Sequence, residues 1–314
     1  MILGEYNSFL LGPSVVNGIA GTAFYGLLAV SLVLTYRISR SVAFVNGGLA
    51  IVGGLMFWYL SFESLNVTFP QPDMPGGLAL IVVALIGFVV GGLYGAFVTG
   101  KRMANWPKIT LTTFSLGLML LFGGIITSVF AGAEETPPSP FGNGSWLIEG
   151  AQFTHHQAYA LGFLMFLVVV LAYVLTRTRS GIYIRSIADN VEAARLVGVP
   201  INKVGTGVYA ISGSIACLTG GLIAPDYGPA IFTMLFVFLR ALTVSVLGGF
   251  NSVVLALAGS LVFSVMDSMM RTGLFGNVTS GRREVIAVGL LFVGVVVVNR
   301  FRKGGKELLS AEGL

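Results

Sequence analysis

Ala188-Asp189-Asn190-Val191-Glu192-Ala193-Ala194-Arg195-Leu196-Val197-Gly198-Val199-Pro200 is a short charged segment that lies between two long apolar runs. Asp189 followed three residues later by Glu192 is typical of a capping box at the start of a helix. Gly198 suits the left-handed residue that ends a helix, and Pro200 prevents its continuation. The segment therefore predicts a helix of about two turns with its own start and stop signals.

The side chains of this predicted helix indicate that it is presented to a partner. Ala193 and Ala194 are small enough to let the helix lie deep in a groove of another protein, and Glu192 and Arg195 would flank that contact with charge. The sequence therefore predicts a contact surface here, within a connecting segment of an otherwise apolar chain.

The composition identifies the class of protein. Of the 314 residues, 55% are hydrophobic and only 10% are charged, whereas a soluble domain carries roughly 25% charged residues. Such a chain cannot cover a water-facing surface, and its 43 glycines are typical of closely packed transmembrane helices. We therefore predict an all-α polytopic integral membrane protein with one domain over residues 1–314, and the net charge of +5 does not indicate nucleic-acid binding.

A helix needs about 20 mostly apolar residues to cross a bilayer, and this criterion predicts eight or nine crossings. The segment 231–249 is the doubtful one, because it carries Arg240 near its middle and either crosses or re-enters. The apolar runs are Ser14–Tyr36, Val42–Phe62, Gly77–Thr99, Ile109–Ala131, Ala158–Thr176, Gly205–Ala224, Ile231–Gly249, Ser252–Met270 and Glu284–Asn299.

The basic residues predict the orientation, because cytoplasmic linkers of membrane proteins are enriched in Lys and Arg. The linkers 63–76 and 132–157 contain none, so we expect them and the N-terminus outside, with the linker 177–203 and the C-terminus in the cytoplasm. A loop with Arg271, Arg282 and Arg283 would be an exception on the outer side. The basic residues of the three predicted inner linkers are Arg37, Arg40, Lys101, Arg102, Lys108, Arg177, Arg179, Arg185, Arg195 and Lys203.

The segment 132–157 is predicted to be the longest structureless segment on the outer face, since it is rich in Pro and Gly. Trp146 within it is a residue type that anchors at the membrane interface. Two interpretations stay open, a loop that receives a partner or the solute and a solvated connector.

Arg240 and Asp267 are charged residues at membrane depth, where each charge costs about 2.5–3.5 kcal/mol and needs a partner. Either they stabilise a helix pair or line a polar path, or Arg240 contacts backbone carbonyls while Asp267 reaches outward. Asn46 and Gly47, near the start of the second apolar run, indicate either a broken helix on a translocation path or close helix packing.

Motifs of enzymes are not found in the sequence. No phosphate-binding loop of the form Gly-x-x-x-x-Gly-Lys-[Ser/Thr] occurs, so we expect no cofactor in this chain. His155 and His156 are adjacent and have no Cys nearby, which argues against a metal site. The sequence therefore predicts a chain without catalytic activity.

The chain resembles the branched-chain (hydrophobic) amino acid permeases of ABC importers, and in particular the first of their two permease types. The resemblance lies in Glu192-Ala193-Ala194 with Gly198, in the preceding stretch Thr178-Arg179-Ser180-Gly181-Ile182-Tyr183-Ile184-Arg185-Ser186-Ile187-Ala188, and in Arg240-Ala241-Leu242-Thr243-Val244-Ser245-Val246-Leu247-Gly248-Gly249. Arg240 stands where the family usually has Lys, and Asp267 where it often has Glu. Asn46 stands where the family has His, a departure that touches either helix packing or the solute path.

The resemblance implies a type II ABC-importer-like permease in the cell inner membrane. The loop 177–203 would couple to an ABC ATPase subunit through Glu192, Ala193, Ala194, Arg195 and Gly198, with ATP and Mg²⁺ on that partner. A second homologous permease chain would share the translocation path, and an extracytoplasmic solute-binding protein would deliver a branched-chain amino acid or a related small solute. One alternative is an ion-coupled secondary transporter, for which the membrane interior offers only Asp267 and Arg240 as charged groups, and a second is a structural or assembly subunit that transports nothing.

Overall fold

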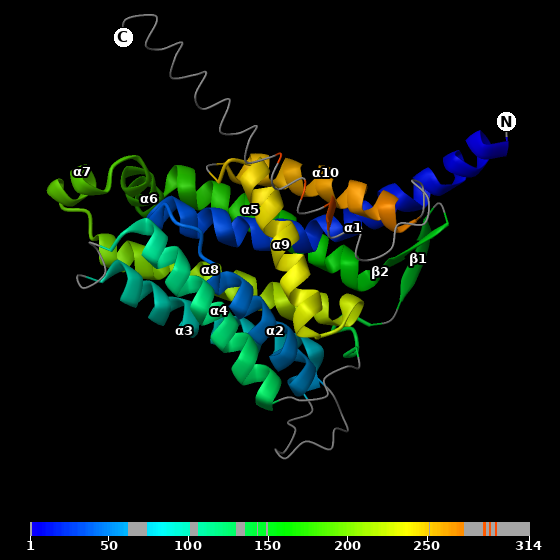
Figure 1. The fold of residues 1–314 in the computed structure, drawn as a ribbon, viewed down its shortest axis with the longest axis horizontal. Helices are drawn as coiled ribbons and strands as arrows, with labels where there is room; N and C mark the ends of the chain where they lie inside the picture. Colours follow the sequence, from blue (N-terminus) through cyan, green and yellow to red (C-terminus); the bar gives the residue numbers. More distant parts are fainter. Residues whose placement is uncertain are drawn as a thin grey trace, which may run out of the picture.

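The structure is a computed structural model, described here over residues 2–61, 74–100, 106–129, 136–142, 144–148, 150–250 and 252–272, with Val285, Ile286, Gly289 and Val293 beyond them. The described residues form a helix bundle with one small hairpin (Figure 1). The elements are α1 (Ile2–Ser39), α2 (Val45–Ser61), α3 (Gly76–Thr99), α4 (Lys108–Val129), β1 (Ser145–Ile148), β2 (Ala151–Thr154), α5 (His155–Arg177), α6 (Arg179–Asp189), α7 (Val191–Leu196), α8 (Ile201–Tyr227), α9 (Ile231–Leu247) and α10 (Val253–Arg271).

The predicted all-α polytopic membrane fold is confirmed. Six of the described helices are long and apolar enough to cross a bilayer, and α2 and α9 are shorter apolar helices. At 17 residues, α9 is about 25 Å long, somewhat less than the roughly 30 Å of hydrocarbon in a bilayer, so its crossing stays a prediction. The predicted ninth span, 284–299, and the basic tail after it lie outside the described residues apart from the four isolated positions.

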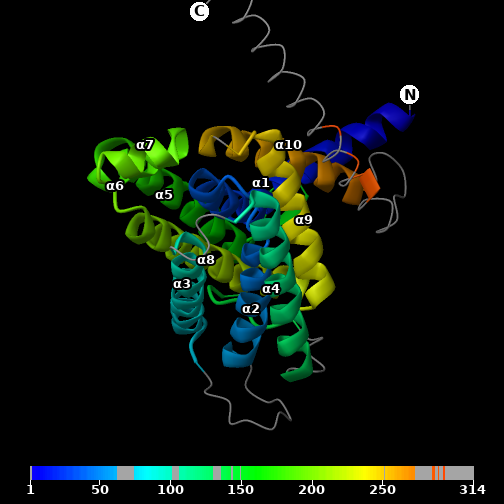
Figure 2. The same cartoon turned by 60° about the vertical axis from the view of Figure 1, so that its left-hand side comes forward.

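The buried centre of the bundle is made by α1, α2 and α8. α8 packs most extensively against α3 and α2, and α1 packs against α10. Figure 2 shows α2, α3 and α4 grouped on one side of the bundle, with α1, α5 and α10 together above them. The outer helices α3, α4 and α5 carry large exposed apolar side chains such as Leu93, Leu120 and Phe166, which suit contact with lipid.

Glycine lets the backbones of α2 and α8 approach closely. A Cβ atom added at Gly220 would clash with the carbonyl oxygen of Ala50, and one added at Gly53 would clash with that of Cys217. Small residues at helix interfaces are the usual means by which membrane helices gain packing contacts, because lipid provides no hydrophobic drive for association. Cys217 is fully buried at this contact.

Gly220→Val is expected to lower the thermal stability of the purified chain by at least about 5 °C, because the clash is with backbone and no side chain can move aside. The measurement is the loss of the monodisperse peak in size-exclusion chromatography after heating in detergent. Gly207→Val is the matched control on the same helix, since nothing lies within 4 Å of a Cβ atom there. Equal melting of the two variants would contradict the packing role of Gly220.

The predicted first span, Ser14–Tyr36, lies within the apolar part of α1, Leu11–Ser39, and the helix itself begins earlier, at Ile2. One prediction about the outer segments is wrong. The segment 132–157 is not structureless, because Ser145–Ile148 pairs with Ala151–Thr154 as an antiparallel hairpin. Trp146 stacks on Phe153 across the hairpin, with ring centroids 6.4 Å apart. Aromatic pairs of this kind stabilise neighbouring strands. The many Pro and Gly residues of the segment led to the prediction of a loop instead.

The bundle has two distinct ends. α6 and α7 lie at one end, and the β1–β2 hairpin lies at the opposite end, close to the N-terminal half of α1 (Figure 1). The end with α7 also holds the C-terminal ends of α1 and α3 and the N-terminal ends of α4 and α8, whose residues line one common cavity. Functional residues can therefore be described by the end at which they lie.

Candidate functional site

The helix α7 starts one residue later than the sequence predicts. The side-chain oxygen of Asn190 accepts hydrogen bonds from the backbone N–H groups of Glu192 and Ala193, at 3.0 and 3.1 Å. Asp189 instead ends α6, and the extended backbone of Asn190 separates the two helices. The predicted capping box of Asp189 and Glu192 is therefore wrong: Asn190 is the N-cap, and Glu192 is too near to it to complete a box.

The predicted helix end is confirmed. Gly198 has φ of +82°, the left-handed conformation that favours glycine. The N–H of Val199 donates to the carbonyl of Ala194, and the N–H of Gly198 donates to that of Arg195, which is the hydrogen-bond pattern of a Schellman motif. The chain then enters α8 directly after Pro200, so α7 is a short rigid turn fixed at both ends.

The exposure of α7 differs from what its small residues suggest. Ala194 is only 2% exposed because it faces the chain's own bundle, so Ala193 alone of the two alanines is at the surface. Leu196 and Val197 are 89% and 78% exposed in the described part of the chain. Two adjacent, largely exposed apolar side chains on a capped turn make this turn a candidate interaction site. The sequence reasoning missed them.

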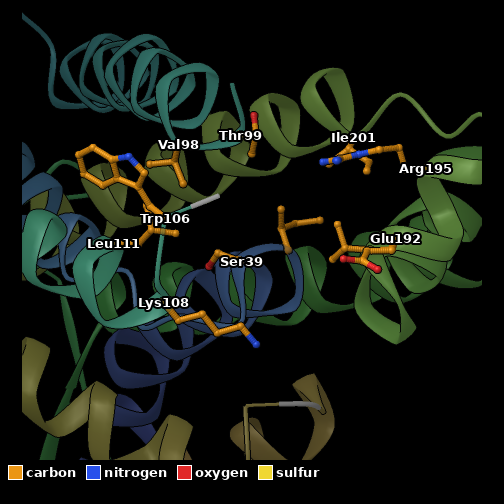
Figure 3. A pocket seen from close by; sticks show the side chains of 11 residues that line it. Ser39, Val98, Thr99, Trp106, Lys108, Leu111, Glu192, Arg195 and Ile201 are labelled. Carbon is orange, nitrogen blue, oxygen red and sulfur yellow. The ribbon is translucent and has the colours of Figure 1, made fainter. Parts of the chain in front are cut away.

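A cavity of about 270 Å³ separates part of α7 from the ends of α1, α3 and α4 (Figure 3). Glu192 and Arg195 line it on the α7 side, and Trp106 and Lys108 line it across from them. α7 contacts chiefly α6 and, less extensively, α8. The helix is therefore attached through α6 and α8 and is not clamped against the other helix ends.

Arg40 connects the end of α1 to the segment before α7. Its guanidinium Nη2 donates a hydrogen bond to the carbonyl of Ala188 in α6. Arg40 itself has φ of +54°, a left-handed conformation that side chains other than glycine rarely adopt. A displacement of α6 and α7 is thereby linked to the turn between α1 and α2.

Arg240 and Asp267 form a buried ion pair between α9 and α10, which fits the interpretation that they stabilise a helix pair. The distance from Arg240 Nη1 to Asp267 Oδ2 is 3.5 Å, and Asp267 is only 4% exposed. The alternative in which Asp267 reaches outward is wrong, because the carboxylate is enclosed by α1, α9 and α10. Such enclosure with a partner is what a charge at membrane depth requires.

Tyr25 and Arg271 complete this cluster, and the sequence reasoning did not assign either to it. Tyr25 donates its hydroxyl proton to Asp267 Oδ2 at 3.2 Å and accepts hydrogen bonds from Arg240 at 3.0 Å and Arg271 at 3.4 Å. Arg271 binds the same Asp267 oxygen through Nε and Nη2, both at 2.9 Å. Arg271 follows Asp267 by four residues on α10, a spacing that places them on one helix face.

Asn46 and Gly47 lie in an unbroken part of the structure. α2 continues from Val45 to Ser61, so the helix is not broken at these residues. The amide of Asn46 donates to the hydroxyls of Ser31, Thr35 and Ser212, at 3.4, 3.5 and 3.0 Å. These contacts join α1, α2 and α8 and fit the packing interpretation, whereas a place on the solute path stays a prediction.

Comparison with known proteins gives one family and several relatives. The family model described as "Branched-chain amino acid transport system / permease component" matches residues 14–298. The high-affinity branched-chain amino acid transport system permease protein LivH of Escherichia coli (strain K12) is 22% identical over 294 residues, covering 90% of this chain and 92% of the relative.

Sugar permeases are also among the relatives. The fructose import permease protein FrcC of Rhizobium meliloti is 24% identical over 315 residues, with 95% of this chain and 80% of the relative covered. The galactose/methyl galactoside import permease protein MglC of Escherichia coli (strain K12) is 29% identical over 220 residues, or 66% and 63% of the two chains. No solved structure matches the chain significantly.

Proposed function

The chain belongs to the branched-chain amino acid permease family, and from this premise we propose that it is the transmembrane permease subunit of an ATP-driven importer. The imported solute would be a branched-chain amino acid or a related small molecule. The chain itself would catalyse no reaction, and ATP and Mg²⁺ would bind to a separate ATPase subunit.

The single observation that carries this proposal is the exposed apolar tip of α7. Leu196 and Val197 project from a turn that Asn190 and Gly198 fix at both ends, so the tip needs little ordering when it binds a partner. Glu192, Ala193 and Arg195 are exposed beside it and would form the rim of the contact. The proposed partner is the ATPase subunit, which would push on α7 when it binds and hydrolyses ATP.

The distribution of basic residues supports the proposed orientation. Arg37 and Arg40 lie at the end of α1, Lys108 at the start of α4 and Arg177 at the end of α5, all at the same end of the bundle as α7. The positive-inside rule would place this end in the cytoplasm of a cell with an inner or plasma membrane. The N-terminus and the segment 132–157 would then face outward, and α7 would lie where ATP is available.

Transport would require two further partners. A second, homologous permease chain would form the translocation path together with this one, and a solute-binding protein outside the membrane would deliver the solute. The β1–β2 hairpin, at the end away from α7, is the proposed receiving surface for that binding protein. Alternation between outward-facing and inward-facing states would follow from the different affinity of nucleotide and solute for the two states.

The test is purification of the chain from its native membrane in a mild detergent, followed by mass spectrometry of the proteins that accompany it. We expect an ATPase subunit and a second permease in the same complex. Proteoliposomes with this complex and the binding protein should take up solute when they contain ATP. Recovery of the chain alone, together with uptake that stops on collapse of a proton gradient and not on ATP depletion, would instead identify an ion-coupled secondary transporter.

A further inference from the structure

A second cavity, of about 230 Å³, lies at the end of the bundle away from α7, between α1, α8 and α10. Its charged and aromatic lining residues are Tyr25, Asp226, Tyr227, Asp267 and Arg271. The volume is below the range of about 300–1,000 Å³ that is typical of drug-sized ligands, so it suits a small solute. In the proposed orientation this cavity lies near the outer surface, where a solute would arrive.

The α10 side of the cavity carries one cation, Arg271, next to one carboxylate, Asp267. Among the residues that the structure describes, the cluster behind it contains two guanidinium groups, of Arg240 and Arg271, and one carboxylate, of Asp267. Arg271 is held in place by Asp267 and by the ring of Tyr227, whose centroid is 5.1 Å from its Cζ atom. Within the described part of the chain, its Nη1 group makes no hydrogen bond. This fixed guanidinium is therefore able to bind an anionic group.

The α8 side of the same cavity provides a negative charge. One oxygen of Asp226, Oδ2, accepts a hydrogen bond from Gln157 at 3.1 Å, which fixes the orientation of the carboxylate. Its second oxygen, Oδ1, accepts no hydrogen bond among the residues described here. The cavity thus has a fixed cation on α10 and a fixed anion on α8.

We propose that this cavity binds the charged end of a zwitterionic amino acid, with Arg271 on its carboxylate and Asp226 on its ammonium group. The inference rests on the proposed function, since it assigns a solute site within the importer. A sugar has only neutral hydroxyl groups, which would leave the carboxylate of Asp226 without a counter-charge, whereas the ammonium group of an amino acid would supply one. The site thus favours an amino acid over the sugars that some relatives carry.

The experiment uses the intact complex in proteoliposomes with its binding protein, and it measures ATP-dependent uptake of L-leucine, L-leucinamide and D-galactose. Leucinamide lacks the carboxylate and galactose lacks both charges. We expect uptake of leucine to exceed that of either other probe by at least about 100-fold, because a site built for a polar group rejects analogues that lack it. Arg271→Gln should raise the KM for leucine at least about tenfold, and Arg271→Lys should restore part of the loss.

Asp226→Asn tests the ammonium subsite independently and lies on a different helix, so it serves if Arg271→Gln does not fold. It should also raise the KM for leucine at least about tenfold. Tyr173→Phe, at an exposed position of α5, is the control and should leave uptake unchanged. ATPase stimulation by the binding protein reports that each variant complex is assembled.

The outcomes separate this inference from the proposed function. ATP-dependent uptake of galactose without uptake of leucine would contradict the amino-acid site, but it would agree with the proposed function as an importer. If both Arg271→Gln and Asp226→Asn transport leucine with wild-type kinetics, the cluster has only a structural role between the helices. That result would also contradict the proposed amino-acid site. Absence of ATP-dependent uptake for every probe would overturn the proposed function itself.

Discussion

Leu196→Asp is expected to reduce ATP-driven uptake by at least about tenfold while the chain stays folded. The side chain of Leu196 is 89% exposed, so little of it packs against the described part of the chain and its replacement should leave the bundle folded. If the tip of α7 is buried by the ATPase subunit, a carboxylate there loses apolar contact and its own hydration. Removal of an apolar side chain from the centre of an interface lowers the binding free energy by about 2 kcal/mol or more. A loss of this size weakens docking roughly 30-fold.

The measurement compares uptake and ATPase activity in proteoliposomes that contain the variant or the wild-type complex. Leu196→Met is the matched control, because it keeps an apolar side chain of similar size. Gly198→Asp tests the same contact by changing the end of α7. A side chain at this position would meet no atom within 4 Å, but the left-handed backbone that ends the helix would be strained. Normal uptake by Leu196→Asp would remove α7 from the contact with the ATPase subunit.

The case of α7 shows what the sequence alone can predict about such a site. The presence of a short capped helix follows from the turn and cap residues, because Asn190, Gly198 and Pro200 act through local backbone geometry. The start of the helix was misplaced by one residue, because Asp189 and Asn190 are equally good caps and only α6 decides between them. The buried position of Ala194 and the exposure of Leu196 depend on how α7 rests on the bundle, which no local pattern reveals.

The membrane helices were predicted well because the bilayer imposes length and apolarity on each of them separately. The charged cluster was predicted only in part, since the partners of Asp267 come from α1, α9 and α10. Arg240 was recognised because an isolated charge in an apolar run needs a partner. Tyr25 gives no such signal, because a tyrosine in a transmembrane segment is ordinary in sequence and becomes informative only through its three contacts.

The two sites lie at opposite ends of the bundle, and α1 and α8 extend between them. Arg40, at one end of α1, binds the carbonyl of Ala188 close to α7. Tyr25, on the same helix, contacts the cluster that lines the opposite cavity. A shift of α1 along its axis would therefore alter both sites together, which is the kind of shared element that coupling between ATP hydrolysis and solute access requires.

Asp267→Asn is expected to destabilise the chain by about 3–5 kcal/mol, the usual cost of breaking a buried ion pair by removing one partner. The variant leaves the guanidinium groups of Arg240 and Arg271 beside one another without the carboxylate that both contact. The temperature at which half of the purified protein aggregates should fall by at least about 6 °C. Asp189→Asn, which removes a carboxylate from an exposed position, is the control and should melt like the wild type.

The double variant Asp267→Asn with Arg240→Gln decides whether the loss of stability in Asp267→Asn has an electrostatic cause. It removes one positive and one negative charge, so the cluster regains its wild-type net charge of +1, now carried by Arg271 alone, whose side chain is 33% exposed. If buried charge without a counter-charge causes the instability, the double variant should recover at least half of the lost melting temperature. If the polar contacts of Asp267 matter only as packing, the two substitutions should add, and the double variant should be less stable than either single one. A wild-type melting temperature for Asp267→Asn would contradict both explanations and show that the cluster has no structural role in the bundle.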